Sequence, residues 1–368
     1  MANNHVTILE IDNQALEHNL NYFKSKLNPE TKILAVVKAF GYGSDGVLVG
    51  DFLKDKVDYF GVAYAQEGIA LREAGIETPI MVLHPQIQNF DAIINHRLEP
   101  CLYNFKTLDA FFALADERLL LNYPVHLNFN TGLNRLGFWH NDIAILLSKI
   151  NENKYIKIIS FFSHLAASED PEEKEFSINQ INNFAYIVSQ MYKALPYEPF
   201  IHMLNTSGVI NYSNAQFDMV RVGIGLYGFG NDENETSQLQ NTHNLYSVIS
   251  QVHLIEPGET VGYNRVFVAK QPTKTATVPI GHADGIPRAV GNQKGFVIVN
   301  NQKAPIIGNV CMDMIMIDVT KIDCKEGDRV TIFNSQEMIQ AFSDAAETIP
   351  YETLTAISAR VKKMLKKL

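Results

Sequence analysis

The stretch ILAVVKAFGYG, residues 33–43, brings together a run of apolar residues, a lysine and a glycine-bracketed turn. Five apolar residues lead directly into Lys38, and Gly41-Tyr42-Gly43 follows soon after. A short, continuously apolar run is typical of a strand buried on both faces, as in a parallel sheet. A lysine at the end of such a strand either reaches solvent or faces a site at the strand end. The rest of the sequence decides between these two interpretations.

Similar apolar runs recur along residues 33–228. The segments between them carry apolar residues at helical spacing, most clearly at 63–75 and 172–195. Eight strands that alternate with helices favour an α/β fold, namely a (β/α)8 barrel of the TIM type. The predicted strands lie at 33–39, 59–63, 80–83, 98–102, 124–129, 156–164, 200–205 and 218–228.

The character of the chain changes after a polar stretch at 231–244, which has no hydrophobic period and is predicted to be a linker. Closely spaced strands are expected beyond it, with helices at about 338–347 and over 351–368. This pattern predicts a barrel domain at 8–234 and a mainly β C-terminal domain at 235–368. Residues 1–10 are candidates for packing against the second domain. The predicted strands of that domain lie at 246–255, 273–280, 295–300, 304–319 and 328–333.

Composition excludes several classes of protein. The formal net charge is −9 over 368 residues, and there is no basic stripe, which argues against a nucleic-acid partner. Cys101, Cys311 and Cys324 are widely spaced and form no CxxC pair, so neither a disulfide framework nor a zinc cluster is expected. The start MANNHVTILEID lacks a signal-peptide pattern, and no apolar run approaches the ~18 residues of a membrane helix. We therefore expect a cytoplasmic protein without a membrane partner.

Polar residues gather at the predicted strand ends, where a (β/α)8 barrel has its active site. Lys38 ends the first strand, Arg135 follows the fifth, His164 ends the sixth and Arg221 lies in the eighth. Taken singly, His164 is most simply a hydrogen-bonded core histidine and Arg135 a surface arginine. Because several such residues converge on one rim, a functional site becomes the better interpretation of Lys38.

The glycine-rich stretch RVGIGLYGFG, residues 221–230, offers backbone N–H groups that can hold a phosphate at the end of the eighth strand. A lysine at a buried strand end can form a Schiff base with a carbonyl cofactor, and pyridoxal phosphate is the obvious candidate. The glycines at 223, 225 and 228 also match G-x-G-x-x-G. A dinucleotide-binding turn should open a helix and precede an acidic residue ~20 positions on, whereas a polar linker follows here. A purely structural glycine turn is the third interpretation.

Eight motifs occur in order along nearly the whole chain: AVVKAFGYG, NTGLNRLGF, SHLAASED, RVGIGLYG, VGYN, VPIGHADGIPR, GNVCMDM and TIPYETLTAISAR. In content and spacing they resemble the alanine racemase family. The resemblance implies pyridoxal phosphate as cofactor, and interconversion of L-alanine and D-alanine to supply D-alanine for peptidoglycan. It also implies a barrel followed by a β domain, in a head-to-tail homodimer whose active sites are shared between the subunits.

The resemblance implies catalytic roles for individual residues. Lys38 is the expected Schiff-base lysine and the base on one face of the substrate. Tyr263, which taken alone is a strand aromatic, is the expected base on the opposite face, contributed by the partner subunit. Arg221 is expected to face the pyridine nitrogen, with His164 bonded near it. Because arginine stays protonated, that nitrogen should carry no proton, and the cofactor becomes a weaker electron sink.

Binding roles follow from the same resemblance. The substrate carboxylate is expected at Arg135 and at the backbone of Met312. Many relatives have a carbamylated lysine where this sequence has Asn128, so the negative charge beside a partly buried Arg135 is missing. We expect a chloride between Asn128 and Arg135, or else a direct hydrogen bond with water. The residues expected to hold the phosphate are Tyr42, Thr206, Gly223, Ile224 and Tyr351.

Other functions stay open at this point. A related racemase could act on serine or on several amino acids. A decarboxylase of similar fold usually places an acidic residue opposite the pyridine nitrogen, and Arg221 argues against it. A cofactor-carrying binding protein would have no use for Tyr263 as a second base.

Overall fold

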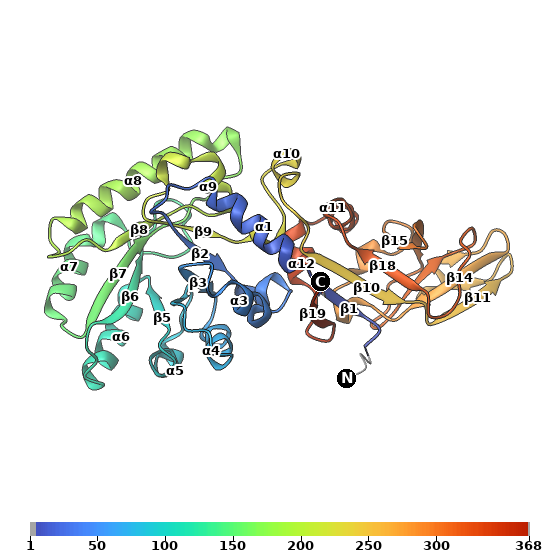
Figure 1. Cartoon of the computed structure of the whole chain (residues 1–368), viewed down its shortest axis with the longest axis horizontal. Coiled ribbons are helices and arrows are strands. Elements are labelled where there is room, and N and C mark those ends of the chain that lie inside the picture. The colour runs from blue at the N-terminus through green and yellow to red at the C-terminus, as the bar shows by residue number, and fades with distance from the viewer. Residues whose placement is uncertain (1–4, 367–368) are drawn as a thin grey trace.

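Eight parallel strands close into a barrel in the first part of the chain (Figure 1). The computed structural model describes residues 5–366. Each barrel strand pairs in parallel with its neighbours, and the last strand closes on the first. The predicted (β/α)8 barrel is therefore confirmed. Its strands are β2 (Lys32–Val36), β3 (Tyr59–Val62), β4 (Ile80–Val82), β5 (Glu99–Leu102), β6 (Tyr123–Asn128), β7 (Ile156–Phe162), β8 (Phe200–His202) and β9 (Met219–Val222).

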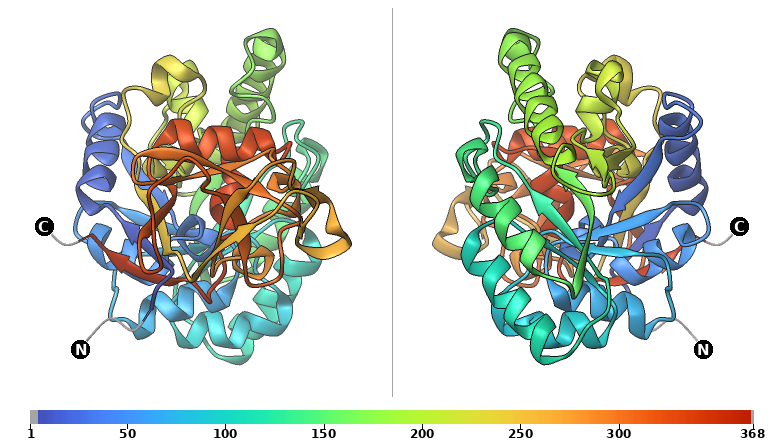
Figure 2. Two further views of the ribbon diagram at one scale, coloured as in Figure 1. Left: turned by 90° about the vertical axis from the view of Figure 1, so that its right-hand side faces the viewer. Right: turned by 90° about the vertical axis from the view of Figure 1, so that its left-hand side faces the viewer.

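Helices surround the barrel strands, as the view onto the barrel end shows (Figure 2, right). Their apolar faces bury against the strands, which explains the helical spacing seen in the sequence. Within residues 5–366, no helix is both long and apolar enough to cross a membrane. The helices of this part are α1 (Asn13–Lys24), α2 (Lys38–Tyr42), α3 (Gly46–Leu53), α4 (Ala65–Glu73), α5 (Phe90–Asn95), α6 (Phe105–Glu117), α7 (Ile143–Glu152), α8 (Lys174–Tyr192) and α9 (Thr206–Asn211).

The second part of the chain is built on a nine-stranded sheet in the order β11-β14-β17-β16-β15-β18-β10-β1-β19, with a separate hairpin, β12-β13. It lies beside the barrel along the long axis of the molecule (Figure 1). Its strands are β1 (Ile8–Ile11), β10 (His243–Val248), β11 (Gln251–Ile255), β12 (Thr260–Val261), β13 (Phe267–Val268), β14 (Thr273–Val278), β15 (Phe296–Val299), β16 (Gln302–Ile307), β17 (Ile315–Asp318), β18 (Arg329–Phe333) and β19 (Lys362–Leu365). The helices here are α10 (Glu233–Thr236), α11 (Gln336–Ala345) and α12 (Pro350–Thr355).

The helix predicted over 351–368 is wrong in extent. Only α12 is helical, and residues 362–365 form strand β19, which pairs in parallel with β1. The lysine-rich sequence has good helix propensity, but strand β1 offers unpaired backbone groups at this sheet edge, and pairing with them overrides a local preference. Residues 367–368 of that prediction lie outside the described residues.

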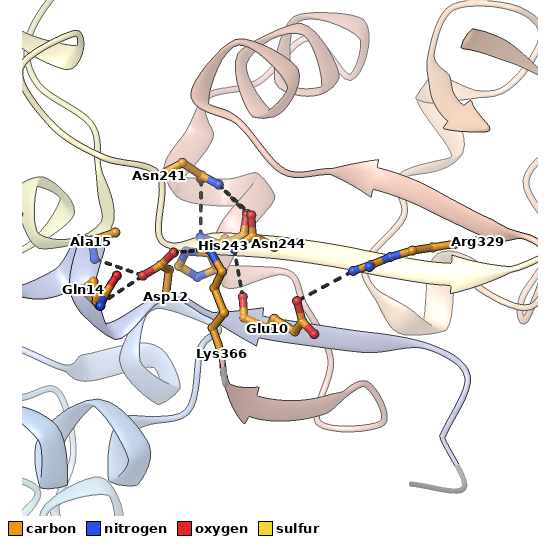
Figure 3. A network of polar contacts seen from close by, with 9 residues as sticks. All are labelled: Glu10, Asp12, Gln14, Ala15, Asn241, His243, Asn244, Arg329 and Lys366. Carbon is orange, nitrogen blue, oxygen red and sulfur yellow. Dashed lines mark hydrogen bonds and ion pairs between the residues drawn. The ribbon is translucent and has the colours of Figure 1, made fainter. Parts of the chain in front are cut away.

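A polar network joins the N-terminal strand, the linker and the C-terminal strand (Figure 3). The Asp12 carboxylate accepts hydrogen bonds from the N–H groups of Gln14 and Ala15, both at 3.1 Å, and so caps helix α1. The same carboxylate pairs with Lys366 at 2.7 Å. Strand β1 is thereby fixed between β10 and β19 immediately before the chain enters the barrel.

Candidate active site

Lys38 stands at the start of α2, which is a short left-handed turn and not a regular helix, and one residue separates it from the end of β2. The residues at 39–43 all have positive φ, with values from 53° to 81°. Three of them, Ala39, Phe40 and Tyr42, are not glycine, and each costs roughly 1–2 kcal/mol in this conformation. Such strain persists only where surrounding contacts hold it, and it is common at functional sites.

Glu67 supplies the contacts that hold this turn. Its carboxylate accepts hydrogen bonds from the N–H groups of Ala39 at 2.6 Å and Phe40 at 3.4 Å. The second oxygen accepts from Ala63 at 2.7 Å and Tyr64 at 3.2 Å. One side chain at the start of α4 therefore ties the segment after Lys38 to the end of β3.

A cavity of about 550 Å³ opens at the carboxyl ends of the barrel strands. It brings together residues that are far apart in the sequence and that come from the barrel loops and from helix α12. The predicted site residues that line it are Lys38, Tyr42, Asn128, Arg135, His164, Thr206, Arg221, Gly223, Ile224 and Tyr351.

Positive charge dominates the centre of this cavity. Burial, Arg135 and Arg221 lower the pKa of Lys38, with Glu67 acting against them, so its amine loses a proton more readily than an exposed lysine. Burial lowers the pKa of Arg221 to about 10, which still leaves the guanidinium charged near neutral pH. Burial and Arg221 hold the pKa of His164 well below its ordinary value, so this imidazole is neutral.

Arg221 is held by acceptors on three sides. Its Nη2 donates to Nδ1 of His164 at 3.0 Å and to the carbonyl oxygens of Ser163 and Met203 at 2.7 and 2.9 Å. Its Nη1 donates to Nδ1 of His202 at 2.7 Å. Among the described residues, no acceptor contacts Nε of Arg221, so this donor stays available to a group in the cavity.

A small polar cup lies where β9 runs into a short 3-10 helix at Ile224–Tyr227. Thr206 Oγ1 accepts hydrogen bonds from the N–H groups of Gly223 at 3.1 Å and Gly225 at 3.4 Å. A Cβ on Gly223 would lie 2.5 Å from the Tyr42 hydroxyl, so only glycine leaves this space open. N–H groups at a helix start, together with hydroxyl groups, suit a phosphate. The cup and the nearby lysine thus fit a cofactor that carries both a phosphate and a carbonyl.

Two predicted site residues lie elsewhere. Within residues 5–366, neither Tyr263 nor Met312 lines the cavity, and they are 70% and 58% exposed. Both are held by backbone contacts within the second part of the chain: Asn309 Nδ2 donates to the Tyr263 carbonyl oxygen at 3.0 Å, and the Ala283 N–H donates to the Met312 carbonyl oxygen at 3.0 Å.

Arg135 and Asn128 both line the cavity, but Arg135 is exposed in the single chain, not partly buried as expected from the sequence. Nearby, the Asn130 side chain is held by the local turn. Its Oδ1 accepts from the N–H groups of Gly132 and Asn134 at 3.1 and 3.0 Å, and its Nδ2 donates to the Asn134 side chain.

Sequence reasoning missed Glu67 and His202. Glu67 stands at the third position of helix α4, where an acidic residue often caps the backbone, but its contact with the Lys38 turn has no local signal. His202 lies within an apolar run that predicted a strand, and a buried polar residue there is the one available hint of a partner.

These features define a class: barrel enzymes that hold a phosphate-bearing carbonyl cofactor at the carboxyl ends of the strands. Residues 11–230 match the family model "Alanine racemase, N-terminal domain", and residues 242–365 match "Alanine racemase, C-terminal domain". The chain belongs to the alanine racemase family. This family depends on pyridoxal phosphate.

Relatives and solved structures agree with this assignment over nearly the full length. Alanine racemase 1 of Caldanaerobacter subterraneus subsp. tengcongensis is 33% identical, covering 97% of this chain and 94% of that protein. Alanine racemase of Halothermothrix orenii is 35% identical, covering 98% and 97%. The Bartonella henselae alanine racemase, solved with covalently bound pyridoxal phosphate, superposes with a TM-score of 0.87 at 28% identity, covering 98% of this chain and 100% of that one. The Bacillus anthracis alanine racemase, solved with bound L-Ala-P, gives 0.91 at 26%, covering 100% and 96%.

Proposed function

We propose that this chain interconverts L-alanine and D-alanine with pyridoxal phosphate, in a homodimer whose active sites each combine residues of both subunits. One observation carries the proposal: Lys38, Arg221 and the Thr206–Gly223 cup line the same cavity at the carboxyl ends of the barrel strands. The covalently bound pyridoxal phosphate and the bound L-Ala-P of the two solved racemases support the cofactor and the substrate.

Racemisation removes a proton from one face of Cα and returns a proton to the other. When bound, pyridoxal phosphate acidifies this Cα–H bond by accepting electron density from the attached amino acid. Lys38 takes or returns the proton on one face, which its lowered pKa favours. Tyr263 of the partner subunit does the same on the opposite face. Arg221 would donate a hydrogen bond to the pyridine nitrogen of the cofactor, and because arginine stays protonated that nitrogen would carry no proton of its own.

The remaining predicted site residues bind the phosphate of the cofactor and the carboxylate of the substrate. The hydroxyl groups of Tyr42, Thr206 and Tyr351 and the N–H group of Ile224 would hold the phosphate, in the space that Gly223 leaves open. Burial raises the pKa of Tyr42 and raises that of Tyr351 to about 12, so both phenols stay protonated and can donate to an anion. Arg135 and the backbone N–H of the partner's Met312 hold the substrate carboxylate.

The dimer is inferred from two predicted site residues, Tyr263 and Met312, that do not line the cavity of a single chain. Two short stretches of the second domain, 263–268 and 312–314, expose large apolar side chains: Tyr263, Val266, Val268, Met312 and Met314 are each at least 47% exposed. An exposed apolar group of this kind commonly marks an interface. In a two-fold dimer, the second domain of each subunit can cap the barrel of the other and complete its site.

The proposal includes a domain division and a location. The barrel domain comprises residues 8–234 and the second domain residues 235–368, with β1 contributing a strand to the sheet of the second domain. The enzyme is proposed to act in the cytoplasm, where D-alanine is made for peptidoglycan.

A direct assay tests the function. The purified protein loaded with pyridoxal phosphate is incubated with L-alanine, and D-alanine is measured by chiral chromatography; the reverse reaction and L-serine are run in parallel. We expect racemisation of alanine in both directions, faster than that of serine. Carbon dioxide release instead of D-alanine would indicate a decarboxylase, and binding without turnover would indicate a carrier; either result overturns the proposal.

A further inference from the structure

A continuous chain of hydrogen bonds runs through the barrel interior from Arg221 to Glu99. Arg221 Nη1 contacts Nδ1 of His202 at 2.7 Å, and Nε2 of His202 contacts the Ser160 hydroxyl at 3.0 Å. The Ser160 hydroxyl contacts Nδ1 of His126 at 2.6 Å, and Nε2 of His126 contacts Glu99 at 2.8 Å. These five residues, called the barrel network below, come one each from the consecutive strands β5 to β9.

The two ends of the barrel network determine the direction of every hydrogen bond in it. Arginine can only donate, so Nδ1 of His202 carries a lone pair and its Nε2 carries the hydrogen. That hydrogen goes to Ser160, whose own hydrogen then goes to Nδ1 of His126. The Nε2–H of His126 finally goes to Glu99, because an ionised carboxylate can only accept. All donors therefore point from the cavity toward Glu99.

The barrel network also answers a charge problem. Arg221 is 4% exposed, and among the ion pairs of residues 5–366 none includes it. A buried cation without a carboxylate is costly. Glu99, with a side chain only 12% exposed, holds a negative charge at the far end of the same hydrogen-bonded chain. The linking residues His126, Ser160 and His202 are fully buried, so water does not screen this connection.

We propose that Glu99 is a remote positioning residue for the racemase reaction: through His126, Ser160 and His202 it fixes the histidine tautomers and polarises Arg221, the group that faces the cofactor nitrogen. The inference rests on the proposed function of Arg221. The barrel network explains why two histidines lie in a barrel core that could otherwise be apolar. The Tyr59 hydroxyl also donates to Glu99 and does not continue the chain toward the cavity.

The tautomers can be observed without any substitution. In holoenzyme labelled with ¹⁵N-histidine, the side-chain nitrogens of His126 and His202 are assigned by NMR at neutral pH. We expect both rings to be neutral with the hydrogen on Nε2. A doubly protonated His126 would mean that a local ion pair with Glu99 ends the chain there. That result, or an Nδ1–H tautomer in either ring, would overturn the proposal.

A double-mutant cycle tests whether the barrel network acts on catalysis. Glu99→Gln keeps a hydrogen-bond acceptor but removes the charge, and Ser160→Ala breaks the chain in the middle. Each should lower kcat roughly tenfold, as loss of an outer hydrogen-bonded partner commonly does, with KM for alanine within about twofold. Because both act through the same chain, the double variant should be no slower than Ser160→Ala alone. Ser160→Thr, which keeps the hydroxyl, should restore kcat.

The visible absorption band of the bound cofactor gives a readout apart from turnover, and it should change in Glu99→Gln. The matched control is Glu77→Gln, which removes a carboxylate that is 68% exposed, and it should alter neither the band nor kcat. Multiplicative losses in kcat, or an unchanged band with unchanged kcat in Glu99→Gln, would refute the proposal. If the protein fails to racemise alanine but shows the expected tautomers, the proposed function fails and the directed network stands.

Discussion

Arg221 Nη2 donates a hydrogen bond to Nδ1 of His164 across 3.0 Å. The contact makes His164 an acceptor at Nδ1, and burial beside three cations keeps the ring neutral. His202 contacts the same guanidinium and is also neutral, because burial and Arg221 hold its pKa well below the ordinary value. Two neutral imidazoles thus accept hydrogen bonds from the charged guanidinium that would face the pyridine nitrogen. Protonation of either ring would turn this acceptor into a second positive charge beside Arg221.

Neutral buried histidines predict a loss of stability in acid. His164, His202 and His243 all have a pKa lowered by burial, that of His243 to about 4. Below pH ~6.5 the unfolded chain takes up protons that the folded chain refuses, so the free energy of unfolding should fall by about 1 kcal/mol per pH unit for each histidine. Urea unfolding at pH 7.5, 6.5 and 5.5 measures this. His243→Gln should reduce the slope, and the exposed-site control His140→Gln should not. A flat profile would contradict the buried neutral state.

Lys38→Ala should abolish racemisation, with a loss of roughly a thousandfold or more, because it removes both the covalent attachment and one base. The borohydride-sensitive absorption band near ~420 nm that a Schiff base gives should also disappear. Circular dichroism checks that the fold is intact. Lys32→Ala removes an exposed lysine at the start of β2, the strand that leads to Lys38, and should change neither property. A variant at position 38 that kept a reducible band would exclude Lys38 as the attachment site.

The barrel could be predicted because a buried strand leaves a local pattern in the sequence. A strand buried on both faces is a continuous apolar run, and each of the eight runs contains a strand in the structure. The residues at which the strands end were less predictable. Residues 218–228 were expected to be one strand, but β9 ends at Val222, where the backbone turns into the polar cup. The left-handed turn after Lys38 was not foreseen, since positive φ at alanine and phenylalanine contradicts their local preference.

Contacts between distant residues could not be read from the sequence. Glu67 is 28 positions from Ala39, and His126 is 27 positions from Glu99. No periodicity or spacing links such pairs, because barrel closure alone brings their strands together. The resemblance of motifs indicated Lys38, Arg221 and His164, but it carried no information about residues outside the motifs, such as Ser160.

Glu67→Gln should weaken the hydrogen bonds that hold the turn after Lys38. The carboxylate accepts four N–H groups, and an amide would present its NH₂ group to two of them, which leaves donors unpaired. We expect a loss of unfolding free energy on the order of 1–3 kcal/mol and roughly tenfold weaker retention of pyridoxal phosphate. Dialysis of the loaded protein followed by absorbance measures retention. Glu73→Gln, at an exposed position of the same helix, is the control. Equal retention in both variants would show that Glu67 only caps α4.

Shared active sites predict complementation between two inactive variants. A Lys38→Ala subunit can still lend Tyr263, and a Tyr263→Phe subunit can still offer Lys38. Random exchange makes about half of the dimers mixed, each with one intact site of two, so activity should recover to about a quarter of the wild-type value. The mixture is assayed before and after subunit exchange. If exchanged mixtures stay inactive, Tyr263 does not act in the partner's site.

The last prediction concerns the charge beside Arg135. Asn128 and Arg135 line the same cavity, and Asn130 is held by its own turn. Asparagine carries no charge, so neither Asn128 nor Asn130 supplies a negative charge beside Arg135. An amide can donate hydrogen bonds to an anion, as the guanidinium can, and chloride is the expected occupant. Activity should therefore rise with halide concentration and be indifferent to bicarbonate, because asparagine cannot be carbamylated. Bromide-soaked crystals should show an anomalous peak between the two side chains. Asn128→Asp carries its own negative charge and should remove the halide dependence. Activity that is flat across halide concentration, with only water in the map, would refute the anion site.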